Sequence, residues 1–352
     1  MHNHPLRRTL ALSAGALLAL GGTVACAQDD ADTSATTTGD TVGVVAAFYP
    51  LQFLAERIGG DAVTVTGLAP PGAEPHDLEL NPQQVGQISD ADLVVYLSGF
   101  QPAVDAAVEQ EAGDAAFDVV TVEPLLDATD GGHSHEHGEE EHAEDEHAED
   151  EHGHEEEEPG HDDEPTPGGE AVDEHADEDT AKDPHLWLDP TRFATVADEL
   201  AARLGKADPD RADDFTARAA ALRTELEALD TEYAEGLATC ERREIITSHA
   251  AFGYLAVRYE LEQIGITGLS PEDEPAPQRL AEVIEEAREH QATTIFFETL
   301  VSPAVAETIA SEVGAQTAVL DPIEGLQPDA DGDYFSVMRD NLDSLTTALG
   351  CS

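Results

Sequence analysis

The chain has few cysteines, few aromatic residues and very few basic residues. Of its 352 residues, three are Cys, 5% are Phe, Trp or Tyr, and 16 are Lys or Arg against 76 Asp or Glu. The formal charge of -60 repels the phosphates of nucleic acid and the anionic headgroups of a membrane surface. Nucleic-acid binding is therefore excluded, and cations are the expected partners. The 40% of hydrophobic residues suffices for one large core or two ordinary ones.

Residues 1–26 have the features of an export signal. Two arginines precede an apolar run of small residues that is too short to remain as a membrane-spanning helix. The run ends at Cys26, in a TVAC sequence that is similar to a bacterial lipobox, although Thr23 stands where an aliphatic residue is usual. We expect an exported protein of the cell surface or periplasm, anchored to the membrane by a lipid on Cys26 through a tether at 27–40. Ordinary signal peptidase cleavage beside Cys26 is the alternative.

Cys240 and Cys351 are the two cysteines of the remaining chain. Because an exported protein meets an oxidising environment, we predict that they form a disulfide bond. Two separate buried thiols are the alternative. The bond would fix the last residues of the chain to the start of its second half, with a stabilisation on the order of a few kcal/mol.

Residues 41–130 alternate short runs of β-branched residues with stretches that suit helices. This alternation is typical of a parallel sheet covered by helices, so we predict an N-terminal α/β lobe. Prolines stand where its helices are expected to begin, and a pair of glycines ends the first one. The strands that we expect are 42–48, 63–68, 93–97 and 119–122.

Residues 131–183 differ sharply from the rest in composition, with nine His, 24 Asp or Glu, and one basic residue. Such a segment has almost nothing to bury and repels itself, so we predict a disordered loop. Its imidazoles would bind borderline metals weakly, and its carboxylates would raise the local cation concentration. A charged insertion that serves only solubility is the alternative.

After a short loop at 184–191, residues 192–238 have apolar residues at steps of three and four, which predicts a long linking helix or two helices with a break near 206–210. Such a linker would limit hinge closure. Residues 239–352 repeat the pattern of the first half, with strands expected at 245–248, 264–269, 294–298 and 317–320, and helices at 250–259, 277–290, 303–313 and 334–349. We therefore predict the α/β class, with two similar parallel-sheet lobes joined by a long rigid backbone helix.

Four histidines lie outside the signal and the His/acid-rich loop: His76, His185, His249 and His290. The first three lie in loops that follow or border expected strands, where ligands bind in open α/β sheets. Neutral imidazoles together with a carboxylate form a ligand set that suits zinc. His290 lies at a charged helix end, where an imidazolium is favourable, and is not expected to bind metal.

The order and context of these segments resemble the ZnuA-like family of metal-specific ABC-transporter substrate-binding proteins. The motifs that carry the resemblance are VVAAFYPLQFLAERIGG, PGAEPHDLEL, DPHLWLDP, TSHAAFGYLA and VLDPIEGL. The resemblance implies two α/β lobes linked by a rigid helix, with the metal between them. It also implies the ligands His76, His185, His249 and Asp321. Water, or an acidic residue near the first histidine such as Glu74, is the alternative to Asp321.

Zinc is the expected ion, because three imidazoles favour it and manganese-specific relatives tend to have a carboxylate where His249 stands. The resemblance then implies a non-enzymatic protein that captures Zn²⁺ outside the cytoplasm and delivers it to the permease and ATPase subunits of an ABC importer. The sequence leaves the oligomeric state open, and a monomer is the default expectation. An exported zinc hydrolase, with three histidines and a water on the metal, is the first alternative. A metal-buffering surface protein or adhesin is the second.

Overall fold

The computed structural model describes residues 41–128, 181–330 and 332–352. The predicted signal, the lipidation at Cys26, the tether, and residues 131–180 of the His/acid-rich loop lie outside these ranges. Among the helices that are described, none combines the length and the hydropathy that a membrane crossing requires.

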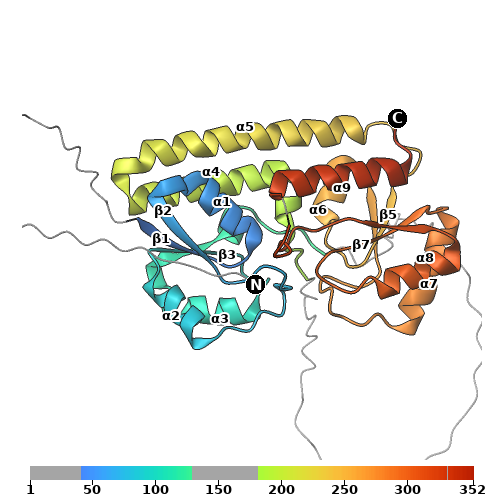
Figure 1. The fold of residues 1–352 in the computed structure, drawn as a ribbon, viewed down its shortest axis with the longest axis horizontal. Coiled ribbons are helices and arrows are strands. Elements are labelled where there is room, and N and C mark those ends of the chain that lie inside the picture. Colours follow the sequence, from blue (N-terminus) through green and yellow to red (C-terminus); the bar gives the residue numbers. More distant parts are fainter. Residues whose placement is uncertain (1–40, 129–180, 331) are drawn as a thin grey trace, which may run out of the picture. The chain divides into compact units, whose positions relative to one another are not determined.

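The N-terminal lobe contains a parallel four-stranded sheet in the order β2-β1-β3-β4 (Figure 1). Buried valines fill its central strands, in register from Val42 opposite Val63 and from Val44 opposite Leu93. Each of its three helices begins at or beside a proline, whose fixed φ suits a first helical turn. The elements are β1 Val42–Ala46, α1 Tyr49–Gly59, β2 Val63–Gly67, α2 Pro82–Asp90, β3 Leu93–Tyr96, α3 Pro102–Glu111 and β4 Ala116–Asp118.

The strand predicted at 119–122 is wrong. The fourth strand is β4, which ends at Asp118, and Val119–Thr121 forms a 3-10 turn. The carboxylate of Asp118 accepts hydrogen bonds from the backbone N–H of Val120 and of Ser98, both at 3.1 Å. These bonds end the strand and begin the turn, and the valines that follow suited a strand by composition alone.

The C-terminal lobe repeats this arrangement, with a parallel sheet in the order β6-β5-β7-β8. The second strand predicted for this lobe, 264–269, begins later and ends later than β6, because the chain leaves the sheet after Gly265, whose carbonyl accepts hydrogen bonds from the Arg279 guanidinium at 2.7 and 3.2 Å. The elements are β5 Glu244–Thr247, α6 Gly253–Tyr259, β6 Glu262–Gly265, α7 Pro277–Glu289, β7 Thr294–Phe297, α8 Ala304–Val313, β8 Gln316–Val319 and α9 Tyr334–Leu349.

Two helices, not one, form the linking segment. They are α4 (Pro190–Ala207) and α5 (Ala212–Gly236), separated by a 3-10 turn at Pro209–Arg211. They pack against each other, and α5 runs past both lobes, contacting α1 in one and α9 in the other (Figure 1). The larger of two apolar cores includes buried residues from both sheets and from both linking helices, and the smaller one lies within the C-terminal lobe.

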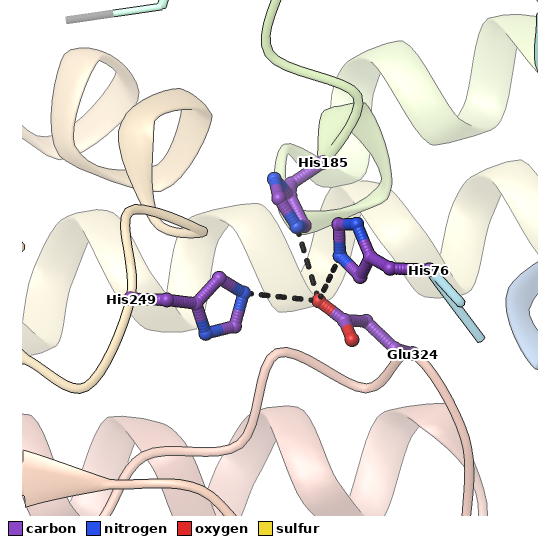
Figure 2. Close-up of side chains that lie close together, drawn as sticks. All are labelled: His76, His185, His249 and Glu324. Carbon is purple, nitrogen blue, oxygen red and sulfur yellow. Dashed lines mark hydrogen bonds and ion pairs between the residues drawn. The ribbon is translucent and has the colours of Figure 1, made fainter. Parts of the chain in front are cut away.

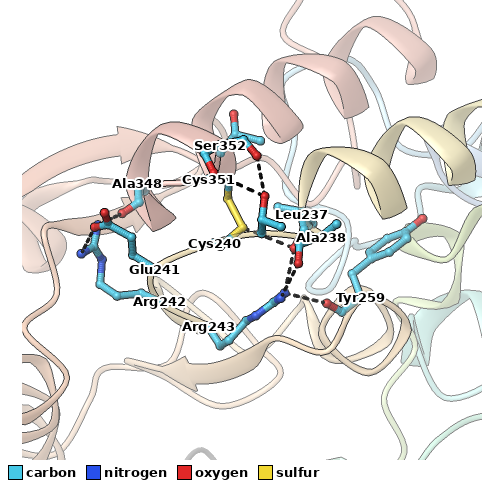
Figure 3. The surroundings of a disulfide bond; sticks show 12 residues. Leu237, Ala238, Cys240, Glu241, Arg242, Arg243, Tyr259, Ala348, Cys351 and Ser352 are labelled. Atoms are coloured by element: carbon cyan, nitrogen blue, oxygen red, sulfur yellow. Dashed lines mark hydrogen bonds and ion pairs between the residues drawn. A yellow bond between two sulfur atoms is a disulfide. The ribbon is translucent and has the colours of Figure 1, made fainter.

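Cys240 and Cys351 form the disulfide bond that the sequence predicts (Figure 3). The bond joins the loop after α5 to the residues after α9, across a sequence separation of 111. Backbone contacts support it, because the N–H of Ser352 donates to the carbonyl of Thr239 at 3.0 Å. The end of the chain is thereby attached to the start of the C-terminal lobe.

Candidate metal site

Three histidine side chains from distant parts of the chain converge on one carboxylate oxygen (Figure 2). The Nε2 atoms of His76, His185 and His249 lie 3.3, 3.0 and 3.1 Å from Oε1 of Glu324. The potential ligand atoms of these four residues all lie within 4.8 Å of one another. The side chain of His76 is 10% exposed, whereas those of the other three are 0% exposed. The group is therefore almost entirely shielded from water.

His76 belongs to the loop that follows β2. The carboxylate of Glu74 accepts the backbone N–H of His76 at 3.0 Å and that of Asp77 at 3.3 Å, which fixes the turn. The buried amide of Gln101 donates to the carbonyl of Pro75 at 3.0 Å. The imidazole meets the ring of Phe100 edge to face, with centroids 4.4 Å apart. These contacts aim the side chain at the neighbouring lobe.

His185 is positioned by the residue two places before it. The carboxylate of Asp183 accepts the backbone N–H of His185 at 2.9 Å and lies 2.7 Å from its Nδ1. When Nδ1–H donates to a carboxylate, Nε2 carries the free electron pair that a metal ion requires. Asp183 is 3% exposed and is hydrogen-bonded to Leu126, so the disordered loop predicted for 131–183 does not extend to this residue.

His249 has the same arrangement in the C-terminal lobe. It follows β5, and its Nδ1 lies 2.7 Å from Oε1 of Glu298, the first residue after β7. The backbone carbonyl of His249 accepts the hydroxyl of Thr247 at 2.7 Å and the amide of Gln263 at 3.1 Å. The imidazole and the backbone carbonyl of His249 are thus both held by hydrogen bonds to buried polar side chains of this lobe.

Glu324 lies in a tight turn after β8. The turn passes through Ile323, a buried β-branched residue with φ of 60°, a conformation that is strained for such a side chain. The carboxylate of Asp321 accepts the backbone N–H of Ile323 at 2.8 Å, and the indole N–H of Trp187 donates to the carbonyl of Pro322 at 2.7 Å. The strained turn brings Glu324 to the histidines.

Asp321 and Glu74, the predicted fourth ligand and its alternative, are not in the convergent group. Asp321 accepts hydrogen bonds from the hydroxyl of Thr299 and from the Ile323 N–H, so its carboxylate supports the turn. Glu324, three residues later, lies where Asp321 is predicted to lie, beside the three histidines. Both acids lie in the VLDPIEGL segment, and no pattern in that segment indicates which of the two reaches the histidines.

The buried charges alter the acidity of these groups. Burial alone would lower the pKa of His249, but the charges of Glu298 and Glu324 outweigh it and raise the pKa to about 10. Burial alone would also lower the pKa of His185, but its hydrogen bonds to Asp183 and Glu324 outweigh this effect and raise that pKa. Burial alone would raise the pKa of Glu324, but its hydrogen bonds to the histidines hold that pKa well below the ordinary value.

Glu74 responds differently. Burial, with a smaller contribution from the charge of Glu324, raises the pKa of Glu74 to about 7, although hydrogen bonds from the loop backbone oppose the shift.

His290, which is not expected to bind metal, caps the C-terminus of α7, with Nδ1 3.3 Å from a carboxylate oxygen of Glu244. It is not in the convergent group.

The donor set matches zinc in both chemistry and spacing. Zinc takes four ligands in a tetrahedron at about 2.0–2.1 Å from imidazole nitrogen, which places neighbouring ligand atoms about 3.3 Å apart. The nitrogens lie 3.0–3.3 Å from the Glu324 oxygen, so a small outward shift would admit an ion. The second oxygen of Glu324 is buried and has no hydrogen-bond partner in the described part of the chain.

Two parallel-sheet lobes with three histidines and a glutamate between them define a two-lobe metal-binding protein. The family model described as "Zinc-uptake complex component A periplasmic" (ZnuA) matches residues 44–348. This chain belongs to that family.

Curated relatives carry related names. The high-affinity zinc uptake system protein ZnuA of Bacillus subtilis (strain 168) is 35% identical over 328 residues, which cover 92% of this chain and 93% of that protein. The zinc-binding lipoprotein AdcA of Streptococcus pneumoniae serotype 4 is 34% identical over 307 residues, which cover 86% of this chain. The match spans 55% of AdcA, about half of that protein's length.

Solved structures share the fold. The laminin binding protein Lmb of Streptococcus agalactiae, described as a bifunctional protein with adhesin and metal transporting activity, matches with a TM-score of 0.68 and 29% identity, covering 88% of this chain and 100% of Lmb. The Zn(II)-bound ZnuA-like domain of Streptococcus pneumoniae AdcA matches with a TM-score of 0.65 and 29% identity, covering 88% and 99%. The predicted fold class and family are confirmed.

Proposed function

We propose that this chain captures Zn²⁺ outside the cytoplasm and delivers it to an ABC importer, with His76, His185, His249 and Glu324 as the ligands. The observation that carries the proposal is the convergence of three imidazole nitrogens on one buried carboxylate oxygen. Buried polar groups of this kind are costly unless they are paired or bind a metal. A transported ion replaces the hydrogen bonds between the ligands and balances the charge of Glu324.

Zinc is the ion that this donor set favours over manganese. Three of the four donors are imidazoles, and borderline nitrogen donors suit zinc, whereas manganese prefers a larger number of oxygen ligands. The Zn(II)-bound structure of the related AdcA domain supports this choice.

The protein acts as a monomer with the permease and ATPase subunits of the importer, attached to the membrane by a lipid on Cys26. The family description, which names a periplasmic zinc-uptake component, and the lipoprotein name of a relative support this location. A transport role is favoured over a zinc hydrolase, because four protein ligands in a buried site leave no position for the water that hydrolysis would require.

Zinc titration calorimetry on three forms of the protein tests the proposal. The intact protein and a form that lacks residues 131–180 should each contain one tight site, whereas the His185→Ala form should lose it. The deletion must end at 180, because Asp183 orients His185. Tight zinc binding that survives His185→Ala would overturn the ligand assignment, and zinc uptake that continues unchanged in cells without the protein would favour a buffering or adhesive role.

A further inference from the structure

The two chain segments on either side of residues 129–180 are joined by a short antiparallel pairing next to the metal site. The N–H of Ala128 donates to the carbonyl of Ala181 at 2.7 Å, and the N–H of Asp183 donates to the carbonyl of Leu126 at 3.0 Å. Between these bonds, Asp127 and Lys182 form a bridge and an ion pair. We refer to residues 126–128 and 181–183 as the stem. The stem ends at Asp183, two residues before His185.

One side chain from the other lobe is bonded to both strands of the stem. The hydroxyl of Tyr254, in α6, accepts the backbone N–H of Leu126 at 2.8 Å and donates to the backbone carbonyl of Asp183 at 3.0 Å. Tyr254 is 1% exposed, and its ring lies against the guanidinium of Arg192, 5.3 Å from the ring centroid. The hydroxyl therefore has a fixed position and uses both its donor and its acceptor capacity.

The same contact reaches the carboxylate that orients His185. With the Tyr254 bond, the backbone N–H, the backbone carbonyl and the side chain of Asp183 all have partners. The start of α6 also packs tightly on this residue, because a Cβ on Gly253 would lie 2.5 Å from Oδ2 of Asp183. Asp183 therefore cannot shift without breaking a contact with α6, and His185 is held by two hydrogen bonds to Asp183.

Tyr254 also lies close in sequence to His249, the histidine that its own lobe contributes to the convergent group. His249 is five residues before it, in the loop that leads into α6. One short segment of the C-terminal lobe thus carries a ligand and also holds the residue that orients a ligand of the N-terminal lobe. From this arrangement, which rests on the proposed function, we infer that Tyr254 is a positioning residue whose hydroxyl fixes His185 relative to His249 through the stem and Asp183.

Tyr254→Phe removes only the hydroxyl and keeps the ring. The variant, made in the full-length chain, leaves the Leu126 N–H and the Asp183 carbonyl without this partner. Loss of a residue that orients a metal-binding histidine typically weakens metal binding by about 10–100-fold. We therefore expect the zinc dissociation constant of this variant to be about tenfold higher. The visible absorption spectrum of the Co²⁺-substituted variant should also change, since it reports the ligand geometry.

Tyr233→Phe is the matched control. The hydroxyl of Tyr233 is also buried and also donates to a backbone carbonyl, that of Met338 at 2.6 Å, but it joins α5 to α9. This variant should lose stability while it keeps the zinc affinity and the Co²⁺ spectrum of the unmodified protein. Comparison of the two variants therefore separates a general loss of stability from a specific effect on the metal site.

Gly253→Ala provides a second, independent variant. Alanine is the better helix former, so the backbone should tolerate it, whereas the added methyl group would press on Asp183. We expect weaker zinc binding and an altered Co²⁺ spectrum here as well. The inference is overturned if both Tyr254→Phe and Gly253→Ala bind zinc and absorb like the unmodified protein while His185→Ala loses the site. If His185→Ala keeps the site, the proposed function itself fails.

Discussion

At the scale of single residues, Glu324 is the group on which the site depends. Its carboxylate is fully buried and accepts hydrogen bonds from all three histidines. A buried charge is costly without a partner, so removing this carboxylate would leave the imidazoles without their common counter-charge. Asp321, by contrast, uses its carboxylate to hold the turn that carries Glu324.

Glu324→Gln and Asp321→Asn therefore form a discriminating pair. Glu324→Gln should weaken zinc binding by more than about 100-fold, because it changes a direct ligand. Loss of a residue that only orients a ligand already weakens metal binding by about 10–100-fold. Asp321→Asn keeps an oxygen that can accept the Ile323 N–H, so its dissociation constant should stay close to that of the unmodified protein. Competition titration with a zinc chelator measures both. The reverse ranking would assign the fourth ligand to Asp321.

The raised histidine pKa values predict a pH dependence with a definite sign. His249 has a pKa of about 10 in the metal-free fold against an ordinary value of 6.5. Its ion pairing therefore stabilises the metal-free protein fully below pH 6.5, and this stability is lost as the pH rises towards 10. A zinc ion requires the neutral imidazole, so zinc binding should release protons and strengthen as the pH rises.

Calorimetry at neutral pH in two buffers of different ionisation enthalpy measures the released protons, and thermal unfolding of the metal-free protein measures the stability. We expect net proton release, and a melting temperature that falls between pH 6.5 and 10. A metal-free His249→Gln variant should show a flatter profile in this window. Zinc binding without proton release would contradict the assignment of a protonated His249 to the metal-free state.

Sequence reasoning reached three of the four convergent side chains but not the fourth. His76 and His249 lie in loops that follow strands, and the family resemblance selects them and His185 from the other histidines of the chain. Glu324 was missed because Asp321 and Glu324 lie in one motif, and the choice between them depends on the positive φ of Ile323. That conformation is a property of the packed turn, and glycine, its usual sequence signal, is absent there.

At the scale of elements, buried strands and helix starts were predictable from local chemistry. β1 and β3 are runs of buried apolar residues, and proline marks the beginnings of α2 and α3. The strand wrongly predicted at 119–122 shows that composition alone does not determine where a strand ends. The Asp118 carboxylate, at the end of β4, accepts a hydrogen bond from the backbone N–H of Ser98, and this bond between distant residues cannot be predicted from composition. The disulfide was predictable because the compartment and the cysteine count determine it.

The Cys240–Cys351 bond should contribute to stability without affecting the site. It closes a long segment of chain, so replacing both cysteines by serine should lower the free energy of unfolding by about 2–5 kcal/mol. Neither cysteine contacts a residue of the convergent group, so zinc affinity should be unchanged. Denaturant unfolding of the zinc-free protein and a zinc titration test the two parts. A large loss of affinity would show that the C-terminal attachment also positions the ligands.

At the scale of the whole molecule, one core joins the two lobes. Phe53 in α1 and Phe193 in α4 both pack on Tyr334 in α9, with ring centroids 5.5 and 4.8 Å apart. Opening the lobes widely would expose these rings to water, at a cost of roughly 25 cal/mol for each Å² of apolar surface. The linking helices α4 and α5 share this core.

Small-angle scattering should therefore find nearly the same radius of gyration with and without zinc. The expected change is a local rearrangement of the loops that carry His76 and His185, consistent with limited hinge motion. The form that lacks residues 131–180 gives the clearest comparison. A large compaction on zinc addition would mean that the lobes separate in the metal-free protein despite their shared core.

The most direct test of the central claim is a crystal structure of the zinc-loaded protein with anomalous diffraction measured at the zinc absorption edge. We expect a single strong peak between the lobes, within about 2.0–2.2 Å of Nε2 of His76, His185 and His249 and of a carboxylate oxygen of Glu324. A zinc peak coordinated by other side chains, or none at this position, would contradict it.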